Sequence, residues 1–275
     1  MTDTMKDDGP RRLLPADPEI AARLAASGRE IAAGRATSRG VAAGLALGGA
    51  TIAVAALARD AYGQGPSLPG SVVDVLNFAL TLEELEAEFY TRGVAAGGAL
   101  FSASYPRDVF DQIRKHEEAH VAFLRQTLGS RAIAKPTFDF TAGGALADVF
   151  SNAQTFMGVA QQFEDTGVRA YKGQAATLMP APDVLEAALR IHSVEARHAA
   201  EVRRVRRQKG WISGNVPGDL PASAQATYKG EDNTFHFILA QPSSHARSMT
   251  EAFDEPLTKG QVLAIVRPFV SGRPA

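Results

Sequence analysis

Apolar residues recur every three or four positions between residues 71 and about 208, and strand-like alternation is rare there. This spacing predicts four helices, each with one apolar stripe facing a shared core. The expected helices cover residues 71–93, 106–128, 145–171 and 182–207. The first and third connections are short, whereas segment 129–144 is long enough to cross the length of a bundle. The predicted fold class is therefore all-α, a four-helix bundle (71–208) with one long central crossover.

Beyond residue 208 the helical period is lost, and Gly, Pro, Ser, Asn and Thr become frequent. We expect this irregular C-terminal extension, residues 209–275, to pack on the bundle, because its large apolar side chains need burial. These side chains are Trp211, Phe235, Phe237 and Ile238. A short final helix is predicted from Lys259 to about Arg267, with a capping box formed by Thr258 and Gln261.

The N-terminal part divides into a polar segment (1–40), an uncharged apolar run (41–58) and a linker (59–70). The apolar run predicts a helix with three alternative roles: a cleaved export signal, an uncleaved membrane anchor, or a buried helix of the soluble domain. Residues 56–58 match the A-x-A cleavage pattern, and arginines precede the run. We therefore expect an exported protein, periplasmic or in the cell envelope, with membrane association through 41–58 if that run is retained.

Composition narrows the classes of function. The hydrophobic content of 45% and charged content of 21% are those of a globular chain, so disorder over the full length is excluded. The net charge of −1 provides no basic field, so no nucleic-acid partner is expected. The sequence contains no cysteine, which excludes thiolate metal sites and cysteine nucleophiles. Any metal must be held by oxygen and imidazole ligands.

Charged residues occupy positions that should face the core. Each of the four stripes carries a glutamate at mid-helix, and two of these glutamates are followed three residues later by a histidine, which lies on the same helix face. The residues are Glu83, Glu117 with His120, Glu164, and Glu195 with His198. Each Glu/His pair can reach one ion, and the two lone glutamates can bridge two ions. The pattern predicts a dinuclear carboxylate site holding two iron or manganese ions.

The two halves of the bundle also repeat a tyrosine. Tyr90 follows Glu83 by seven residues, and Tyr171 follows Glu164 by seven. This repeat is what a site with approximate twofold symmetry requires. We take both tyrosines as candidate catalytic residues that hydrogen-bond the bridging ligands or donate an electron; ordinary packing is the alternative.

Two other interpretations of the polar residues remain open. Residues 116–120 match the H-E-x-x-H signature of zinc proteases, but that hypothesis leaves the remaining glutamates buried without a purpose. The second interpretation is a bundle with a network of polar residues in its core, or one that has lost its metal site. Among nearby groups, Glu86 is expected to approach the site most closely, and Glu84 is interpreted as solvated or outlying. His116 and His192 are candidate partners of the ligands.

The segments LNFALTLEELEAEFY, HEEAHVAFLRQTLG and FEDTGVRAYKG resemble the ferritin-like superfamily. With TEAFDEPLTKGQVLAIV included, the chain looks most similar to its desiccation-related ferritin-like domain proteins. The resemblance implies metal ligation by the six Glu and His residues above. We expect a site that reacts with oxygen or peroxide, through ferrous oxidation or peroxide detoxification, in stress protection. The alternative is a non-catalytic envelope protein with a vestigial site. A homo-oligomer or an envelope protein partner is also expected.

Overall fold

The computed structural model of the protein describes residues 68–102, 106–235 and 246–271. The apolar run 41–58 lies outside these residues, as do Phe237 and Ile238. Within the described ranges, no helix has the length and apolar character needed to cross a membrane.

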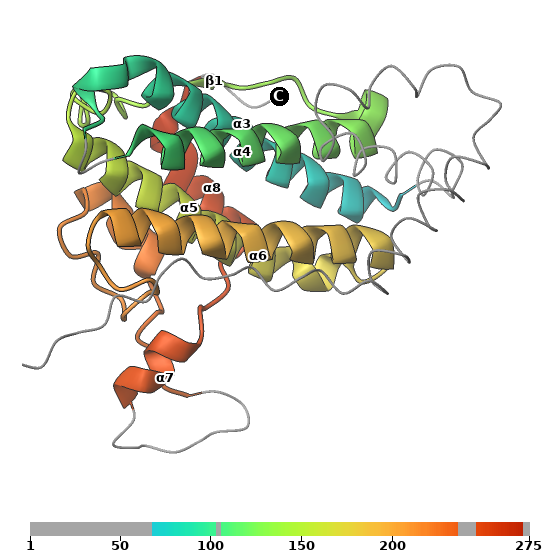
Figure 1. The fold of residues 1–275 in the computed structure, drawn as a ribbon. Coiled ribbons are helices and arrows are strands. Elements are labelled where there is room, and N and C mark those ends of the chain that lie inside the picture. Colours follow the sequence, from blue (N-terminus) through green and yellow to red (C-terminus); the bar gives the residue numbers. More distant parts are fainter. Residues whose placement is uncertain (1–67, 103–105, 236–245, 272–275) are drawn as a thin grey trace, which may run out of the picture. The chain divides into compact units, whose positions relative to one another are not determined.

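Four long helices form the bundle, as predicted (Figure 1). They are α3 (Gly70–Ala96), α4 (Arg107–Leu128), α5 (Ala153–Leu178) and α6 (Pro182–Val205). The helix α3 packs mainly against α4 and also against α5, whereas α5 packs mainly against α6. The all-α fold class with one long crossover, between α4 and α5, is confirmed.

The shorter elements lie in the connections and in the C-terminal extension. They are η1 (Gly97–Ala99), η2 (Gly129–Arg131), β1 (Thr137–Phe138), η3 (Ala222–Tyr228), α7 (Ala246–Ala252), α8 (Lys259–Val266), η4 (Arg267–Phe269) and β2 (Val270–Ser271). The predicted capping box of α8 is confirmed, since the Thr258 and Gln261 side chains each bond the other's backbone N–H.

The third helix begins eight residues later than predicted, at Ala153, and continues to Leu178. Asn152 sets this start, because its side chain accepts hydrogen bonds from the backbone N–H groups of Gln154 and Thr155. The buried Leu146 and Val149 mimic helical spacing but belong to consecutive turns. The crossover therefore runs from residue 129 to 152, and only residues 179–181 separate α5 from α6.

The crossover is held in place by the C-terminal part of the chain. Its strand β1 pairs antiparallel with β2, with Thr137 opposite Ser271 and Phe138 opposite Val270. Phe138 and Phe140 are buried in the same aromatic cluster as Phe269. The sequence did not indicate this pairing, because two residues are too few to show a strand period.

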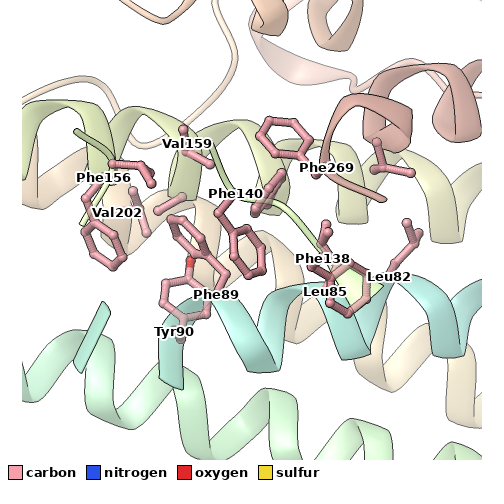
Figure 2. Packing of buried hydrophobic residues seen from close by; sticks show 14 of the residues in the cluster. Leu82, Leu85, Phe89, Tyr90, Phe138, Phe140, Phe156, Val159, Val202 and Phe269 are labelled. Carbon is pink, nitrogen blue, oxygen red and sulfur yellow. The ribbon is translucent and has the colours of Figure 1, made fainter. Parts of the chain in front are cut away.

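Aromatic rings fill the core at one end of the bundle, around Phe89 of α3. Its ring centroid lies 4.8 Å from that of Phe156 and 5.4 Å from those of Phe140 and Tyr90. Figure 2 shows these rings together, with Phe140 contributed by the crossover. The packing fixes the ring of Tyr90 and keeps water away from it, since Phe89 and Tyr90 have no exposed surface.

The extension covers α5 but uses side chains other than the predicted ones. Trp211 is 50% exposed and Phe235 is 66% exposed, so their predicted burial is wrong. Smaller or amphipathic residues are buried instead: Ile212, Leu220, Ala224 and Tyr228. The Lys209 ammonium lies 5.7 Å from the centroid of the Trp211 ring, which explains how this ring remains at the surface.

A buried arginine ties the extension to α5. The Arg169 guanidinium donates hydrogen bonds to the backbone carbonyls of Thr227, Lys229 and Glu255, and pairs with the Glu231 carboxylate at 2.8 Å. These contacts satisfy a charge that would otherwise be costly to bury. The outer face of α5 is therefore closed by residues far away in the sequence.

Gly173 of α5 is where the extension approaches most closely, because a Cβ there would lie 1.9 Å from the Leu257 carbonyl oxygen. We expect Gly173→Ala to lower the free energy of unfolding by about 1–3 kcal/mol, since backbone must move to admit the methyl group. Denaturant unfolding measures the effect. Gly98→Ala is the matched control, because its Cβ would meet nothing within 4 Å. Equal stability of the two variants would contradict this close packing.

Candidate metal centre

The six predicted ligand residues lie together in the middle of the bundle. Each long helix contributes, because each turns its polar mid-helix position inward: Glu83 from α3, Glu117 and His120 from α4, Glu164 from α5, and Glu195 and His198 from α6. The four glutamates have no exposed surface, and His198 is 4% exposed. His120 is half-buried.

Donor atoms of these residues form two overlapping groups, within each of which all donor atoms lie within 4.8 Å of one another. The first group contains Glu83 and His120, and the second contains Glu164 and His198. Glu117 and Glu195 belong to both groups. Each group could hold a metal ion, and the shared pair is placed to bridge them. The expectation that Glu83 and Glu164 bridge is thus not supported, because each lies in one group only.

The two tyrosines hydrogen-bond the unshared glutamates across the bundle. The Tyr90 hydroxyl of α3 donates to Glu164 Oε1 on α5 at 2.5 Å, and the Tyr171 hydroxyl of α5 donates to Glu83 Oε1 on α3. The exchange is reciprocal, as the repeat in the sequence suggested. It fixes one oxygen of each glutamate and leaves the other oxygen turned toward the histidines.

Several buried polar atoms in the cluster have no hydrogen-bond partner among the described residues. They are Glu117 Oε1, Glu164 Oε2, both carboxylate oxygens of Glu195, and His198 Nδ1. His198 Nδ1 lies 2.7 Å from Glu117 Oε1, but the two atoms are not aligned for a hydrogen bond. Unpartnered buried oxygens are costly unless cations compensate them. Hard oxygen donors with two imidazoles suit iron or manganese, so the residues fit a metal pair.

The electrostatics of the cluster show the same excess of negative charge. Burial raises the pKa of Glu195, and the neighbouring Glu117 and Glu83 raise it further. Burial also raises the pKa of Glu83 to about 7, although His120 opposes the shift. Burial alone would raise the pKa of Glu117, but its contacts with His120 and His198 outweigh burial and lower it. Of the two shared glutamates, Glu117 therefore favours the charged form and Glu195 favours the protonated form.

The histidines carry the balancing positive charge. Burial lowers the pKa of His198, but Glu164 and Glu117 outweigh it and raise the pKa to about 11. His120 Nδ1 lies 3.0 Å from Glu83 Oε2 and 3.0 Å from Glu117 Oε2, and its pKa is also raised, against the effect of burial. Both rings are therefore protonated without metal, and binding of a metal ion to either ring would release a proton.

Of the two additional histidines, only His116 reaches the cluster. Its Nδ1 lies 2.9 Å from His198 Nε2, and the two rings stack with centroids 5.1 Å apart. His192 Nε2 is buried without a partner among the described residues. His116 belongs to neither group of candidate ligands, which disfavours the H-E-x-x-H zinc hypothesis because that site needs His116 beside His120.

Two features near the cluster were missed in the sequence. Glu84 is buried rather than solvated, and it pairs with Arg125 of α4. Gly167 of α5 stands one turn after Glu164, and its missing side chain leaves room for the Glu195 carboxylate. In the sequence, the only indication of this space is a glycine three residues after the predicted ligand Glu164.

An apolar cavity of about 20 Å³ adjoins the cluster at Tyr171. Its lining includes Leu76, Ala79 and Leu82 of α3 and Ala188 and Ile191 of α6. This volume has room for about one small molecule, and an apolar lining disfavours water.

The fold and the cluster define a class of protein: a helical bundle with a carboxylate and imidazole site in its core. A family model described as a ferritin-like domain matches residues 71–208, half of the chain, and the chain belongs to this family. The comparison with curated proteins found no match.

Proposed function

We propose that the protein holds two iron or manganese ions between its four long helices and reacts with dioxygen or peroxide, by ferrous oxidation or peroxide detoxification. The observation that carries the proposal is the pair of overlapping donor groups that share Glu117 and Glu195. Such ions, when bound, supply electrons to a small oxidant. Unpartnered buried carboxylate oxygens support metal binding over a purely structural polar network.

In this proposal, the two tyrosines orient the carboxylates of the unshared glutamates. Burial and the adjacent carboxylates Glu164 and Glu83 raise the pKa of Tyr90 and Tyr171, so both phenols keep their protons and donate to these carboxylates. The fixed oxygens cannot rotate freely, which directs the second oxygen of each glutamate toward the metal positions. Donation of an electron by either tyrosine stays a prediction.

The apolar cavity beside Tyr171 supports dioxygen as one oxidant. Dioxygen loses no hydrogen bonds on entering an apolar space, whereas peroxide does. The cavity is lined by Tyr171, whose hydroxyl is bonded to Glu83, so one residue separates it from the donor groups.

The physiological setting is proposed on the sequence alone. The resemblance to desiccation-related ferritin-like domain proteins supports a role in stress protection. The uncharged run 41–58 supports export to the periplasm or cell envelope, with or without retention as an anchor. A homo-oligomer or an envelope protein remains the proposed partner.

The test uses the full chain purified without added metal. We expect two iron or manganese ions per chain by elemental analysis, and oxidation of ferrous ion or consumption of peroxide above the rate in buffer. The double variant Glu117→Ala/His120→Ala should lose the metal and fall to the buffer rate, because it removes ligands from both groups. Glu118→Ala is the control, since Glu118 is exposed and pairs with Arg114. A wild-type protein that takes up neither metal would contradict the proposal.

A further inference from the structure

Glu86 is a buried carboxylate that the two donor groups leave out. It lies on α3 three residues after Glu83, on the same face of the helix, and is 2% exposed. No described residue donates a hydrogen bond to it. It therefore differs from Glu84, which is similarly buried but is paired with Arg125 and Lys135.

Gly167 on the opposite helix leaves space beside the Glu86 carboxylate. A Cβ at position 167 would lie 3.4 Å from Glu86 Oε1 and 2.7 Å from Glu195 Oε2. Carboxylate oxygens of both residues thus converge on the gap left by the missing side chain. Glu195 is one of the two glutamates shared by the donor groups, so the Glu86 carboxylate lies beside the candidate metal centre.

The two halves of the bundle differ at the position three residues after the unshared glutamate. On α3 the residues Glu83, Glu86 and Tyr90 follow one another, and on α5 the corresponding residues are Glu164, Gly167 and Tyr171. Glu86 therefore has Gly167 as its counterpart in the other half of the bundle. The extra carboxylate of Glu86 thus breaks the approximate twofold symmetry.

Charge makes Glu86 difficult to explain without cations. It lies in the field of four other buried carboxylates: Glu195, Glu164, Glu117 and Glu83. A charged carboxylate with no donor and like charges around it is costly to bury, so Glu86 stays protonated unless a cation lies nearby. A cation bound at Glu195, whose Oε2 shares the space at Gly167 with Glu86 Oε1, would supply that charge.

We propose that Glu86 is a seventh ligand of the metal pair, reaching it beside Gly167. The inference rests on the proposed dinuclear site and adds one anionic oxygen donor to it. Because the extra ligand comes from one half only, the two bound ions have unequal surroundings.

Cobalt(II) titration of the full chain, followed by visible absorption without oxygen, tests the inference. Wild-type protein should take up two ions. Glu86→Gln should keep two sites but weaken one by at least about tenfold, and should change the cobalt spectrum because the coordination of that ion changes. Glu84→Gln is the matched control and should leave the affinities and the spectrum unchanged, since its partners are Arg125 and Lys135.

Gly167→Ala provides a second variant, because its methyl group would displace the Glu195 carboxylate, which shares the space at Gly167 with Glu86. It should reproduce the weakened cobalt binding. Wild-type affinities and spectrum in Glu86→Gln would overturn the inference and leave the dinuclear site intact. Failure of the wild-type protein itself to bind two ions would overturn the proposed function.

Discussion

Glu195→Gln should make the metal-free protein more stable and remove most of its stabilisation by metal. Both carboxylate oxygens of Glu195 are buried and lack hydrogen-bond partners among the described residues, and Glu117 and Glu83 repel it. Removing the charge while keeping the shape should add about 1–3 kcal/mol to the free energy of unfolding without metal. For a chain of this size that is a rise of several degrees in melting temperature.

The same substitution should have the opposite effect once metal is added. A ligand at about a thousand times its dissociation constant stabilises the folded state by about 4 kcal/mol for each site. Glu195 belongs to both donor groups, so its loss should weaken both ions. Thermal melts with and without Mn²⁺ measure both effects, and exposed Glu118→Gln is the control. A variant that is less stable than wild type without metal, yet equally stabilised by Mn²⁺, would contradict the proposed role.

The metal-free protein should become less stable as the pH rises from 5 to 8. The folded-state pKa of Glu83 is about 7, above its ordinary value of 4.5, so the folded state binds this proton more tightly than the unfolded chain does. Its contribution, about 3 kcal/mol, is complete below pH 4.5 and is lost as the pH rises through 7. The pKa values of His120 and His198 are also raised, so they too make the folded state less stable as the pH rises above 6.5.

Bound metal should reverse this dependence, because ligands must release their protons to bind, and affinity therefore rises with pH. Melting temperatures from pH 5 to 8, with and without Mn²⁺, test the prediction. Burial also raises the pKa of Glu231 to about 7. The variant Glu231→Gln therefore separates the contribution of Glu231 to the pH dependence of stability from that of the candidate metal centre. A metal-free melting temperature that increases over this range would contradict the raised pKa values of Glu83, His120 and His198.

The position of the candidate site could be predicted because its signal is local. A glutamate and a histidine three residues apart must share a helix face, and a glutamate in an apolar stripe must point inward. Which glutamates are shared could not be predicted in the same way. That outcome depends on how α4 and α6 approach each other across the core, which no spacing along one helix records.

The errors in the fold have the same origin. Leu146 and Val149 have helical spacing, but the Asn152 cap and the turns before it decide where α5 begins. Glu84 looks like a surface residue in the sequence, and its burial depends on Arg125, which lies 41 residues away. The pairing of β1 with β2 joins residues more than 130 positions apart, and each strand has only two residues.

Anomalous diffraction from crystals grown with Mn²⁺, recorded at the manganese edge, would locate bound ions in the cluster. We expect two peaks about 3.5–4 Å apart, one beside Glu83 and His120 and the other beside Glu164 and His198, with Glu117 and Glu195 touching both. Peaks elsewhere, or no peak among these six residues, would contradict it.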